Sequence, residues 1–267
     1  MNKKIAIIGG GNLGTAIAEG LIRSGFVLPG HILVTKRNPS TLRHLEEKGV
    51  LVSNDNTEAV RFADLVILAV KPFQVNDVLG ALQPLFDEKR HVLVSVVTGI
   101  STAHIHGILK RKVSTVGAMP NTAIAIQQSM TCISARDMTS EQMDYVKAVF
   151  EQLGKVVVIE EKLMDAATVL AACGTAYAMR YIRANIQGGI EIGFDAATAS
   201  LIAAQTVKGA AQLLLQQNTH PEQEIDKVTT PKGCTIAGLN EMEHQGFSSS
   251  LIKGIVASYD KIATDDK

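Results

Sequence analysis

The chain has 267 residues, of which 46% are hydrophobic and 19% charged, enough for a sizeable core and too apolar for disorder. Its 26 Lys and Arg residues balance 26 Asp and Glu residues, which argues against broad electrostatic attraction to nucleic acid or anionic membranes. Cys132, Cys173 and Cys234 are far apart, which argues against a disulfide framework or a metal site and favours a reducing compartment. Because the apolar runs are too short for a signal peptide or a membrane span, we expect a cytoplasmic protein.

Strand and helix patterns alternate through the first 160 residues. Such alternation is typical of βαβ units and a parallel sheet. We therefore predict an α/β fold in which residues 1–160 form a Rossmann-type doubly wound parallel sheet that binds a dinucleotide. The predicted strands are 4–9, 31–35, 65–70, 92–97, 113–116, 130–134 and 155–160.

Residues 161–267 show almost no strand pattern and predict an all-α domain. The pattern at about 163–190 is apolar on nearly every side, which is typical of a helix buried all round. About a hundred residues of helix cannot easily surround such an element. We therefore predict a dimerisation domain in which helices of two chains interleave, the alternative being a helix covered by its own domain. The other helical patterns lie at about 196–217, 235–245 and 249–263.

A glycine-rich turn lies between the first strand and the first helix, in the sequence IAIIGGGNLG of residues 5–14. Gly9 permits the tight turn, Gly11 lets the backbone approach a pyrophosphate, and Gly14 allows the helix to pack closely on the strand. The start of the helix then offers backbone N–H groups to the anion. The flanking strand and helix favour a dinucleotide site over a plain glycine turn.

The end of the second strand indicates which dinucleotide is bound. NAD-selective sites usually place an acidic residue there for the ribose 2′-hydroxyl, whereas this chain has Thr35, Lys36 and Arg37. A hydroxyl and two cations suit a 2′-phosphate, so we predict NADPH as the cofactor, with NADH possible. The alternative is that the two cations are ordinary solvated surface residues.

Two later strands also end in candidate cofactor contacts. Ligands of parallel sheets bind at the carboxyl ends of the strands, where this chain has Lys71 and the segment SVVTG of residues 95–99. We expect Lys71 to meet phosphate or ribose and the second segment to flank the nicotinamide. A loop lysine without a ligand is the alternative.

The sequence contains no motif of a zinc protease, a serine hydrolase or a P-loop enzyme. His104 and His106 are two residues apart and point to different sides of a helix, so we expect surface histidines and no metal site. A dinucleotide-binding site without recognisable general acid or base residues suits a reaction in which the cofactor itself performs the chemistry. Hydride delivery to an activated, cationic C=N bond is such a reaction.

A second loop, VTTPKGCTIAGL of residues 228–239, places hydroxyls and a glycine before a predicted helix start. Gly233 permits close approach, and the N–H groups at the helix start suit a small carboxylate. The hydroxyls of Thr230 and Thr235 can hydrogen-bond a neighbouring polar atom. We predict a site for a small amino-acid-like substrate, with a plain helix cap as the alternative.

Together with these two loops, five further stretches resemble pyrroline-5-carboxylate reductases nearly from end to end. They are AVKP at 69–72, MPNTA at 119–123, DAATVLAACGTAY at 165–177, AAQTVKGAAQLLL at 203–215 and EHQGFSSSLI at 243–252. The resemblance implies a Rossmann domain followed by a helical dimerisation domain, and reduction of Δ1-pyrroline-5-carboxylate to L-proline by NADPH or NADH. It also implies that the late loop serves the cofactor of the partner chain, which makes the dimer necessary for activity.

The resemblance further implies roles for single residues. The late loop holds the substrate, with Thr235 near the ring nitrogen as the catalytic candidate, Gly233 and Cys234 beside it, and Glu161 as an acidic neighbour. The pyrophosphate loop matches at Gly9, Gly11, Asn12, Leu13 and Gly14. The adenosine side matches at Thr35, Lys36, Arg37 and Asn56, and the nicotinamide side at Ala69, Val70, Lys71, Pro72, Val97, Thr98 and Gly99.

The chain also departs from the family pattern. Gly117 stands where the family commonly has arginine, Thr175 where it has proline, and Lys232 where it has glycine. These departures keep open a non-catalytic NADPH-binding relative. A dehydrogenase of the β-hydroxyacid type has a similar plan, but it needs a catalytic lysine on the first long interdomain helix, and 163–190 contains none.

Overall fold

The computed structural model describes residues 3–265, and its strands form one sheet in the order β3-β2-β1-β4-β5-β6-β7-β8. Neighbouring strands are parallel except β6 and β7, which are antiparallel. The order extends outward from β1 in both directions, which is the doubly wound Rossmann arrangement and confirms the predicted fold class. The strands are β1 (Ile5–Ile8), β2 (Ile32–Thr35), β3 (Leu51–Ser53), β4 (Leu65–Leu68), β5 (Val92–Ser95), β6 (Ser114–Met119), β7 (Ser129–Arg136) and β8 (Gly154–Val158).

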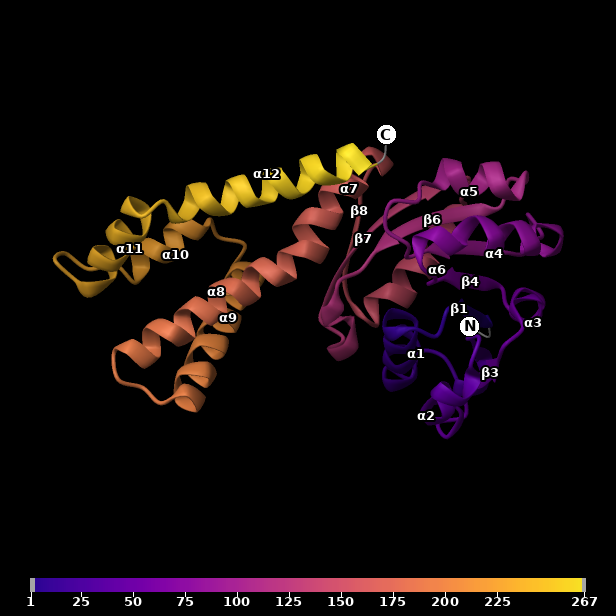
Figure 1. Ribbon diagram of the computed structural model, residues 1–267, viewed down its shortest axis with the longest axis horizontal. Helices are drawn as coiled ribbons and strands as arrows, with labels where there is room; N and C mark the ends of the chain where they lie inside the picture. The colour runs from indigo at the N-terminus through magenta and orange to yellow at the C-terminus, as the bar shows by residue number, and fades with distance from the viewer. Residues whose placement is uncertain (1–2, 266–267) are drawn as a thin grey trace. The chain divides into compact units, whose positions relative to one another are not determined.

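Helices cover both faces of this sheet (Figure 1). Successive residues of a strand face opposite sides, so Ile5 and Ile7 pack with α1 and α6, whereas Ala6 and Ile8 pack with α3, α4 and α5. Packing on both faces fixes β1 and holds its carboxyl end in place. These helices are α1 (Asn12–Arg23), α3 (Asn56–Phe62), α4 (Val75–Leu82), α5 (Thr102–Leu109) and α6 (Ser140–Glu151), with the short α2 (Arg43–Glu46) after β2.

Two features of the sheet differ from the sequence-based expectation. The strand β3 is absent from the predicted strands because it has only three residues, of which Leu51 is exposed and Val52 and Ser53 are partly buried. The antiparallel pairing of β6 with β7 is also unpredicted. Its connection contains only a 3₁₀ turn, Thr122–Ile126, and a parallel pair would need a crossover of a dozen or more residues.

The chain divides into two compact units. The first extends to Cys173 and includes the residues from Ile262, and the second is Gly174–Lys261. The helical pattern predicted from residue 163 to 190 is interrupted, because a π-helix (Thr168–Cys173) separates α7 (Met164–Ala167) from α8 (Gly174–Glu191). Within the first unit, the side-chain amide of Asn121 in the MPNTA stretch donates to the carbonyl of Ala171 in the π-helix at 3.3 Å.

The second unit consists of helices joined by turns, with no strand among its described residues. A short helix that the sequence patterns do not predict, α10, begins at Pro221, where the preceding His220 caps it by accepting the N–H of Glu222 at 3.2 Å. In the part of the chain that the structure describes, no helix is long and apolar enough to span a bilayer. The helices after α8 are α9 (Ala196–Gln217), α10 (Pro221–Lys227), α11 (Cys234–His244) and α12 (Phe247–Asp265).

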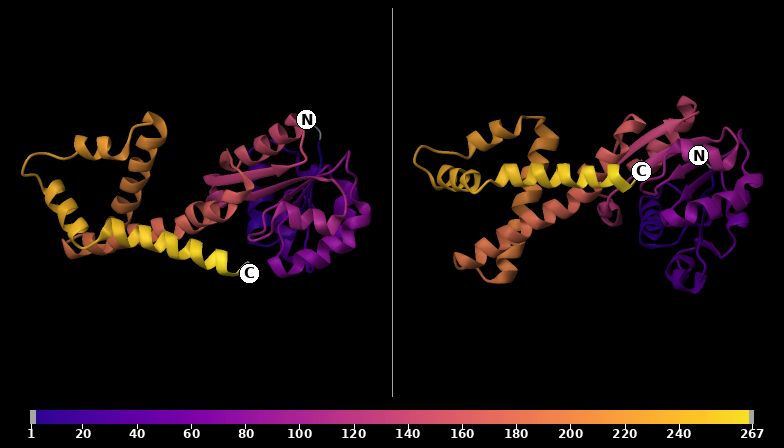
Figure 2. Two further views of the ribbon diagram at one scale, coloured as in Figure 1. Left: turned by 90° about the horizontal axis from the view of Figure 1, so that it is seen from above. Right: turned by 45° about the horizontal axis from the view of Figure 1, so that its top comes forward.

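Helix α8 packs against α9 within this unit (Figure 2) and meets α12 through single side-chain contacts. A Cβ on Gly189 would lie 3.2 Å from Ala199 of α9, and the hydroxyl of Tyr177 is 2.7 Å from that of Ser258 on α12. No residue of α8 is buried, although its pattern predicts burial on every side. The expected burial is therefore not provided within one chain.

One histidine prediction is wrong. His104 is exposed as expected, but only 15% of the His106 side chain is accessible. Its Nε2 lies 3.0 Å from both the carbonyl of Val113 and the hydroxyl of Thr115, and its Nδ1 lies 3.5 Å from Asp137. His106 therefore ties α5 to β6 and to the end of β7, which the spacing of two histidines cannot reveal.

His91, directly before β5, is buried with only 2% of its surface accessible. Its Nδ1 accepts the N–H of Asp87 at 2.8 Å, and the ring stands edge-on to Phe86. Burial, reinforced by the charge of Arg90, lowers the pKa of His91 below its usual value of 6.5. The folded protein therefore keeps this imidazole neutral at pH values where the unfolded chain protonates it.

We predict that His91 makes the protein less stable as the pH falls below about 6.5. In that range the unfolded chain binds a proton that the folded chain excludes, and the loss continues until the pH passes the lowered pKa of the folded state. His91→Asn keeps an acceptor without a titrating ring. It should flatten the dependence of the thermal unfolding midpoint on pH between 7.5 and 5.5, measured by circular dichroism. The exposed His104→Asn is the control, and an unchanged slope in His91→Asn would contradict the assignment.

Candidate functional site

A cleft of about 810 Å³ lies at the carboxyl ends of β1, β2, β4 and β5. This volume is of the size that small-molecule and cofactor sites have. The cleft brings together almost all of the predicted cofactor residues: Gly9, Gly11, Asn12, Leu13, Thr35, Lys36, Arg37, Asn56, Ala69, Val70, Lys71, Pro72, Val97 and Thr98. Residues outside the predicted contacts also line it, namely Ile8, Gly10, Asn38, Asn54, Gln74 and Val78. Asn54 follows β3, so recognising that strand would have identified it.

The three motif glycines have different structural roles. Gly9 adopts φ +113°, and a Cβ there would lie 2.4 Å from the carbonyl oxygen of Ala69. A Cβ on Gly14 would lie 2.1 Å from the carbonyl oxygen of Gly9, so α1 packs directly on the turn. Gly11 has no atom within 4 Å of its Cβ position, so it borders open space in the cleft. The first two positions need glycine for folding, and the third leaves room for a ligand.

The start of α1 faces this open space. Gly11 is the N-cap, and its carbonyl accepts the N–H of Thr15 at 2.9 Å. The N–H groups of Asn12, Leu13 and Gly14 precede that first helical hydrogen bond, so they have no acceptor within the helix. Such a helix start binds anions, and the positive end of the helix dipole adds to the attraction.

Thr35 braces the glycine turn. Its carbonyl accepts the N–H groups of Gly9 and Gly10 at 3.2 and 2.7 Å, and its buried hydroxyl donates to Asn56 Oδ1 at 2.6 Å. The hydroxyl is therefore engaged with Asn56 and not directed at the solvent side of the cleft. Its expected contact with a 2′-phosphate stays a prediction.

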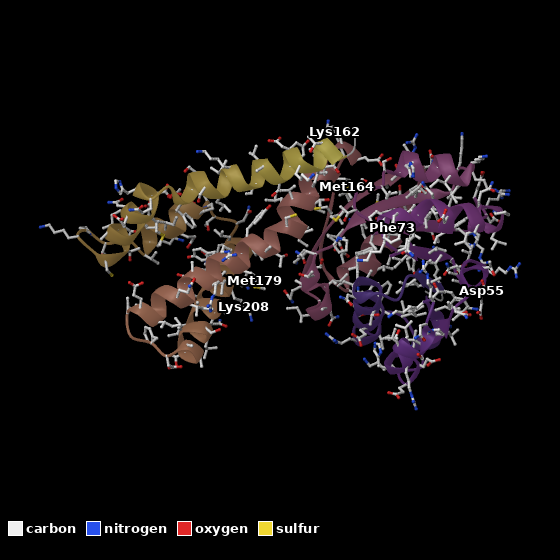
Figure 3. All side chains as sticks on the ribbon, viewed as in Figure 1. Asp55, Phe73, Lys162, Met164, Met179 and Lys208 are labelled. Atoms are coloured by element: carbon white, nitrogen blue, oxygen red, sulfur yellow. The ribbon has the colours of Figure 1, made fainter. Side chains whose placement is uncertain are left out.

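Two cations remain available beside Thr35. Lys36 is half-buried and Arg37 is exposed. Neither side chain forms an ion pair with another residue in the range 3–265. The closest acid along the neighbouring loop, Asp55, is engaged as the N-cap of α3 (Figure 3). Hydrogen bonds from the side chain and backbone of Thr57 lower the pKa of Asp55. Lys36 and Arg37 thus face the cleft without a carboxylate to neutralise them.

A smaller cavity of about 130 Å³ adjoins the loop that follows β5. Its walls include Gly99, which the sequence analysis assigned to the nicotinamide side, and Glu161. The Glu161 carboxylate accepts the N–H of Thr102 at 2.6 Å and the hydroxyl of Thr102 at 2.9 Å. Glu161 therefore fixes the start of α5 and, with it, the loop that ends at Ser101.

The late loop of the second unit is a tight turn leading into α11. The carbonyl of Thr230 accepts the N–H of Gly233 at 2.9 Å, with Pro231 and Lys232 between them. Lys232 has φ +63°, a left-handed conformation that favours glycine. A Cβ on Gly233 would lie 2.4 Å from the Thr230 hydroxyl oxygen, so Gly233 is required by the turn itself.

The helix that follows this turn begins at Cys234, with Gly233 as its N-cap. Thr235 lies in the first helical turn and is partly accessible. Thr230, Gly233, Cys234 and Thr235 therefore form one local cluster at a helix start. The N–H groups of that start and two hydroxyls suit a small ligand that carries a carboxylate and a polar nitrogen.

Comparisons with known proteins cover both units. Residues 161–264 match the family described as Pyrroline-5-carboxylate reductase dimerisation, and residues 4–99 match NADP oxidoreductase coenzyme F420-dependent. Pyrroline-5-carboxylate reductase 1 of Dictyostelium discoideum is 48% identical over 272 residues, which cover 97% of this chain and 49% of that protein. The chain therefore spans about half the length of this relative. Pyrroline-5-carboxylate reductase 2 of the same organism is 44% identical over 276 residues, covering 97% of this chain and 92% of that protein.

Solved structures agree with these matches. A pyrroline-5-carboxylate reductase from Coxiella burnetii has a TM-score of 0.93 and 29% identity, over 99% of this chain and 98% of that one. A Plasmodium falciparum pyrroline carboxylate reductase with NADP bound has a TM-score of 0.89 over 100% of this chain and 99% of that one. At 23% identity, the latter shows the common fold.

We predict that alanine at Gly11 and alanine at Gly14 separate ligand binding from folding. Gly14→Ala should lower the free energy of unfolding by about 2–4 kcal/mol, because its Cβ would overlap the Gly9 carbonyl. Gly11→Ala should fold as stably as the parent but bind NADP⁺ about tenfold more weakly, because its methyl group occupies the open space. Thermal unfolding and fluorescence titration measure the two effects. Unchanged affinity in Gly11→Ala would place the pyrophosphate elsewhere.

Proposed function

The chain belongs to the pyrroline-5-carboxylate reductase family, and from this premise we propose that it reduces the C=N bond of 1-pyrroline-5-carboxylate to give L-proline. It is an NAD(P)-dependent oxidoreductase. The observation that supports the proposal most directly is the glycine-rich turn after β1, which lines the 810 Å³ cleft. The chain that contains it matches the family over 97% of its length. A reduced nicotinamide bound in that cleft supplies the hydride.

NADPH is the proposed donor. The support is the pair Lys36 and Arg37, which line the cleft at the end of β2 without a carboxylate partner among the described ion pairs. No acidic residue follows β2 to take a ribose 2′-hydroxyl. The side-chain amides of Asn38 and Asn54 lie in the same part of the lining and add hydrogen-bonding groups. The guanidinium of Arg37 is suited to the 2′-phosphate because it binds such groups with two parallel hydrogen bonds.

We predict that Arg37→Ala lowers kcat/KM for NADPH by about 10- to 100-fold and changes the value for NADH by less than about threefold. The reason is that the guanidinium meets only the 2′-phosphate, which NADH lacks. Arg43→Ala, which removes an exposed arginine paired with Glu47, is the matched control and should change neither value. A parent enzyme that prefers NADH, or an equal loss with both donors, would contradict the assignment.

The late loop is the proposed substrate site. The N–H groups at the start of α11 would hold the substrate carboxylate, Gly233 and Cys234 would allow it to approach, and Thr235 would hydrogen-bond the ring nitrogen. Glu161 would act from the cofactor side by fixing the loop before α5. In this proposal the side chains bind, orient and exclude water, and they transfer no proton to the reacting carbon.

A dimer with interleaved helices is the proposed assembly. The support is the apolar surface that the second unit exposes, including Met179 at 61% (Figure 3), Ile192 at 78% and Leu201 at 72%. Ala199 and Ala203 are the buried residues of α9, and α8 has none among those described. Exposed apolar surface of this extent marks an interface.

We assign residues 1–160 to cofactor binding and residues 161–267 to dimerisation and substrate binding. The free thiols fit a cytoplasmic location.

We predict that Thr235→Ala lowers kcat for pyrroline-5-carboxylate by about 10- to 100-fold while the affinity for NADPH stays within about twofold. The hydroxyl contributes one hydrogen bond to the reacting ring and none to the cofactor. NADPH consumption with pyrroline-5-carboxylate is the assay, and Ser250→Ala, whose hydroxyl bonds within α12, is the control. A parent protein that binds NADPH without consuming it would be a non-catalytic relative.

Mixing variants tests whether the late loop serves the partner's cofactor. Gly11→Ala chains and Thr235→Ala chains each have a defective site. If sites form between chains, a mixed dimer contains one site with both defects and one intact site, so refolding the two together restores activity. Absence of restored activity in a verified mixed dimer would place cleft and loop of one chain in the same site.

A further inference from the structure

We propose that the 130 Å³ cavity beside Gly117 is a binding site for a small monovalent cation, either an alkali ion such as K⁺ or ammonium. We call it the Gly117 cavity and define it by Ser95, Gly117, Ser134, Glu161, Asp165 and Thr168. All of its walls belong to the first unit. The cavity shares Val97, Gly99 and Glu161 with the residues proposed above for the nicotinamide and the substrate. Its test uses the chain without nucleotide or substrate, so a failure of this proposal is distinguishable from a failure of the proposed reduction.

The floor of the cavity is a row of three residues across three strands. Gly117 on β6 pairs with Ser95 on β5 and with Ser134 on β7, so the three lie side by side in the sheet. Glycine weakens the interior of a strand, and it is often found there where a ligand or another backbone approaches closely. A Cβ on Gly117 would stand 3.3 Å from the Ser134 hydroxyl oxygen and 3.6 Å from the end of Met164. The missing side chain therefore opens space between two hydroxyls.

The hydroxyl of Ser134 is the evidence that the cavity binds a ligand. Ser134 is 2% accessible, and its Oγ has no hydrogen-bond partner within residues 3–265. A buried hydroxyl without a partner destabilises the fold, since it has left water without compensation. The Ser95 oxygen already accepts the N–H of Val97 at 3.3 Å. A cation that prefers oxygen ligands, bound above Gly117, would give the Ser134 hydroxyl oxygen a partner. The same ion could bind the remaining lone pair of the Ser95 hydroxyl oxygen.

The charge of the walls determines the sign of the ligand. Glu161 and Asp165 contribute carboxylates, and no lysine, arginine or histidine is among the described lining residues. Glu161 is fixed by its two hydrogen bonds from Thr102, so its position does not depend on the ligand. A negative cavity with little solvent attracts a cation more strongly than an exposed pair of acids would. An anion is disfavoured by the same charges.

The size and the donor atoms determine the kind of cation. The walls offer hydroxyl and carboxylate oxygens without a nitrogen or thiolate side chain, which is a ligand set for hard cations. A volume of about 130 Å³ holds an ion together with several waters. Met164, labelled in Figure 3 at the start of α7, forms the apolar side of the cavity. By joining α7 to β6 and β7, the ion would hold Glu161 and, through Thr102, the loop before α5.

Thermal unfolding at constant ionic strength tests the proposal. The full chain without nucleotide or substrate is compared in potassium, ammonium and tetramethylammonium chloride. The methyl groups of tetramethylammonium keep hydroxyl and carboxylate oxygens away from its charge, so this ion is the control. We expect the midpoint to be about 3 °C higher in potassium or ammonium than in tetramethylammonium. A shift with potassium alone identifies an alkali-ion site, and a shift with ammonium alone identifies a site for an N–H donor. Equal midpoints in all three salts would overturn the proposal.

Variants of the cavity and a heavy cation test whether the cation-dependent shift of the unfolding midpoint arises at the Gly117 cavity. Ser134→Ala and Asp165→Asn should each remove at least half of the cation-dependent shift, whereas Asp77→Asn, an exposed acid on α4, should retain it. Crystals soaked in thallium(I), a K⁺ substitute, should show an anomalous peak between Ser134 and Asp165. A shift that survives in both cavity variants, or crystals without a peak there, would show that the cation acts elsewhere.

Discussion

The close contact of the start of α1 with the turn after β1 is the constraint on which the cofactor cleft depends. Gly14 lies over the carbonyl of Gly9, which in turn lies against the carbonyl of Ala69 after β4. The backbones of the turn, of α1 and of the segment after β4 thus approach so closely that side chains would overlap. On the β2 side, the Thr35 carbonyl accepts the N–H groups of Gly9 and Gly10. Because this contact is made by backbone atoms, the N–H groups of α1 have a fixed direction before any anion arrives. A site organised in this way spends little free energy on rearrangement when it binds.

The sequence predicts most of the first unit because its signals are local. Seven strands follow from short apolar runs, and the glycine spacing identifies the turn whose geometry Gly9 and Gly14 confirm. What it misses depends on distant partners. The edge strand β3 has three residues and none of them is buried, and the pairing of β3 with β2 brings Asn54 at its end into the cleft. The hydrogen bond from the Thr35 hydroxyl to Asn56, which lies on another element, is likewise not visible in the local sequence pattern.

The helical unit illustrates a different limit of sequence reasoning. Periodicity predicts α9, α11 and α12 close to their bounds. It cannot show the π-helix, because the surrounding segment is apolar on nearly every side and a change of helical phase is therefore not visible. The all-round apolar pattern of α8 predicts burial without saying by what. Within one chain that burial is missing, and the proposed dimer would supply it. The late loop, in contrast, is local, and its cluster forms as the residue types indicate.

The exposed face of α8 and α9 also affects how the heat stability of this protein is to be measured. If the proposed dimer buries these apolar side chains, folding is linked to association, and mass action ties the unfolding midpoint to total protein concentration. Diluting the sample would then lower the midpoint with no change in any intramolecular contact. A midpoint for this molecule therefore has meaning only together with the concentration at which it was recorded.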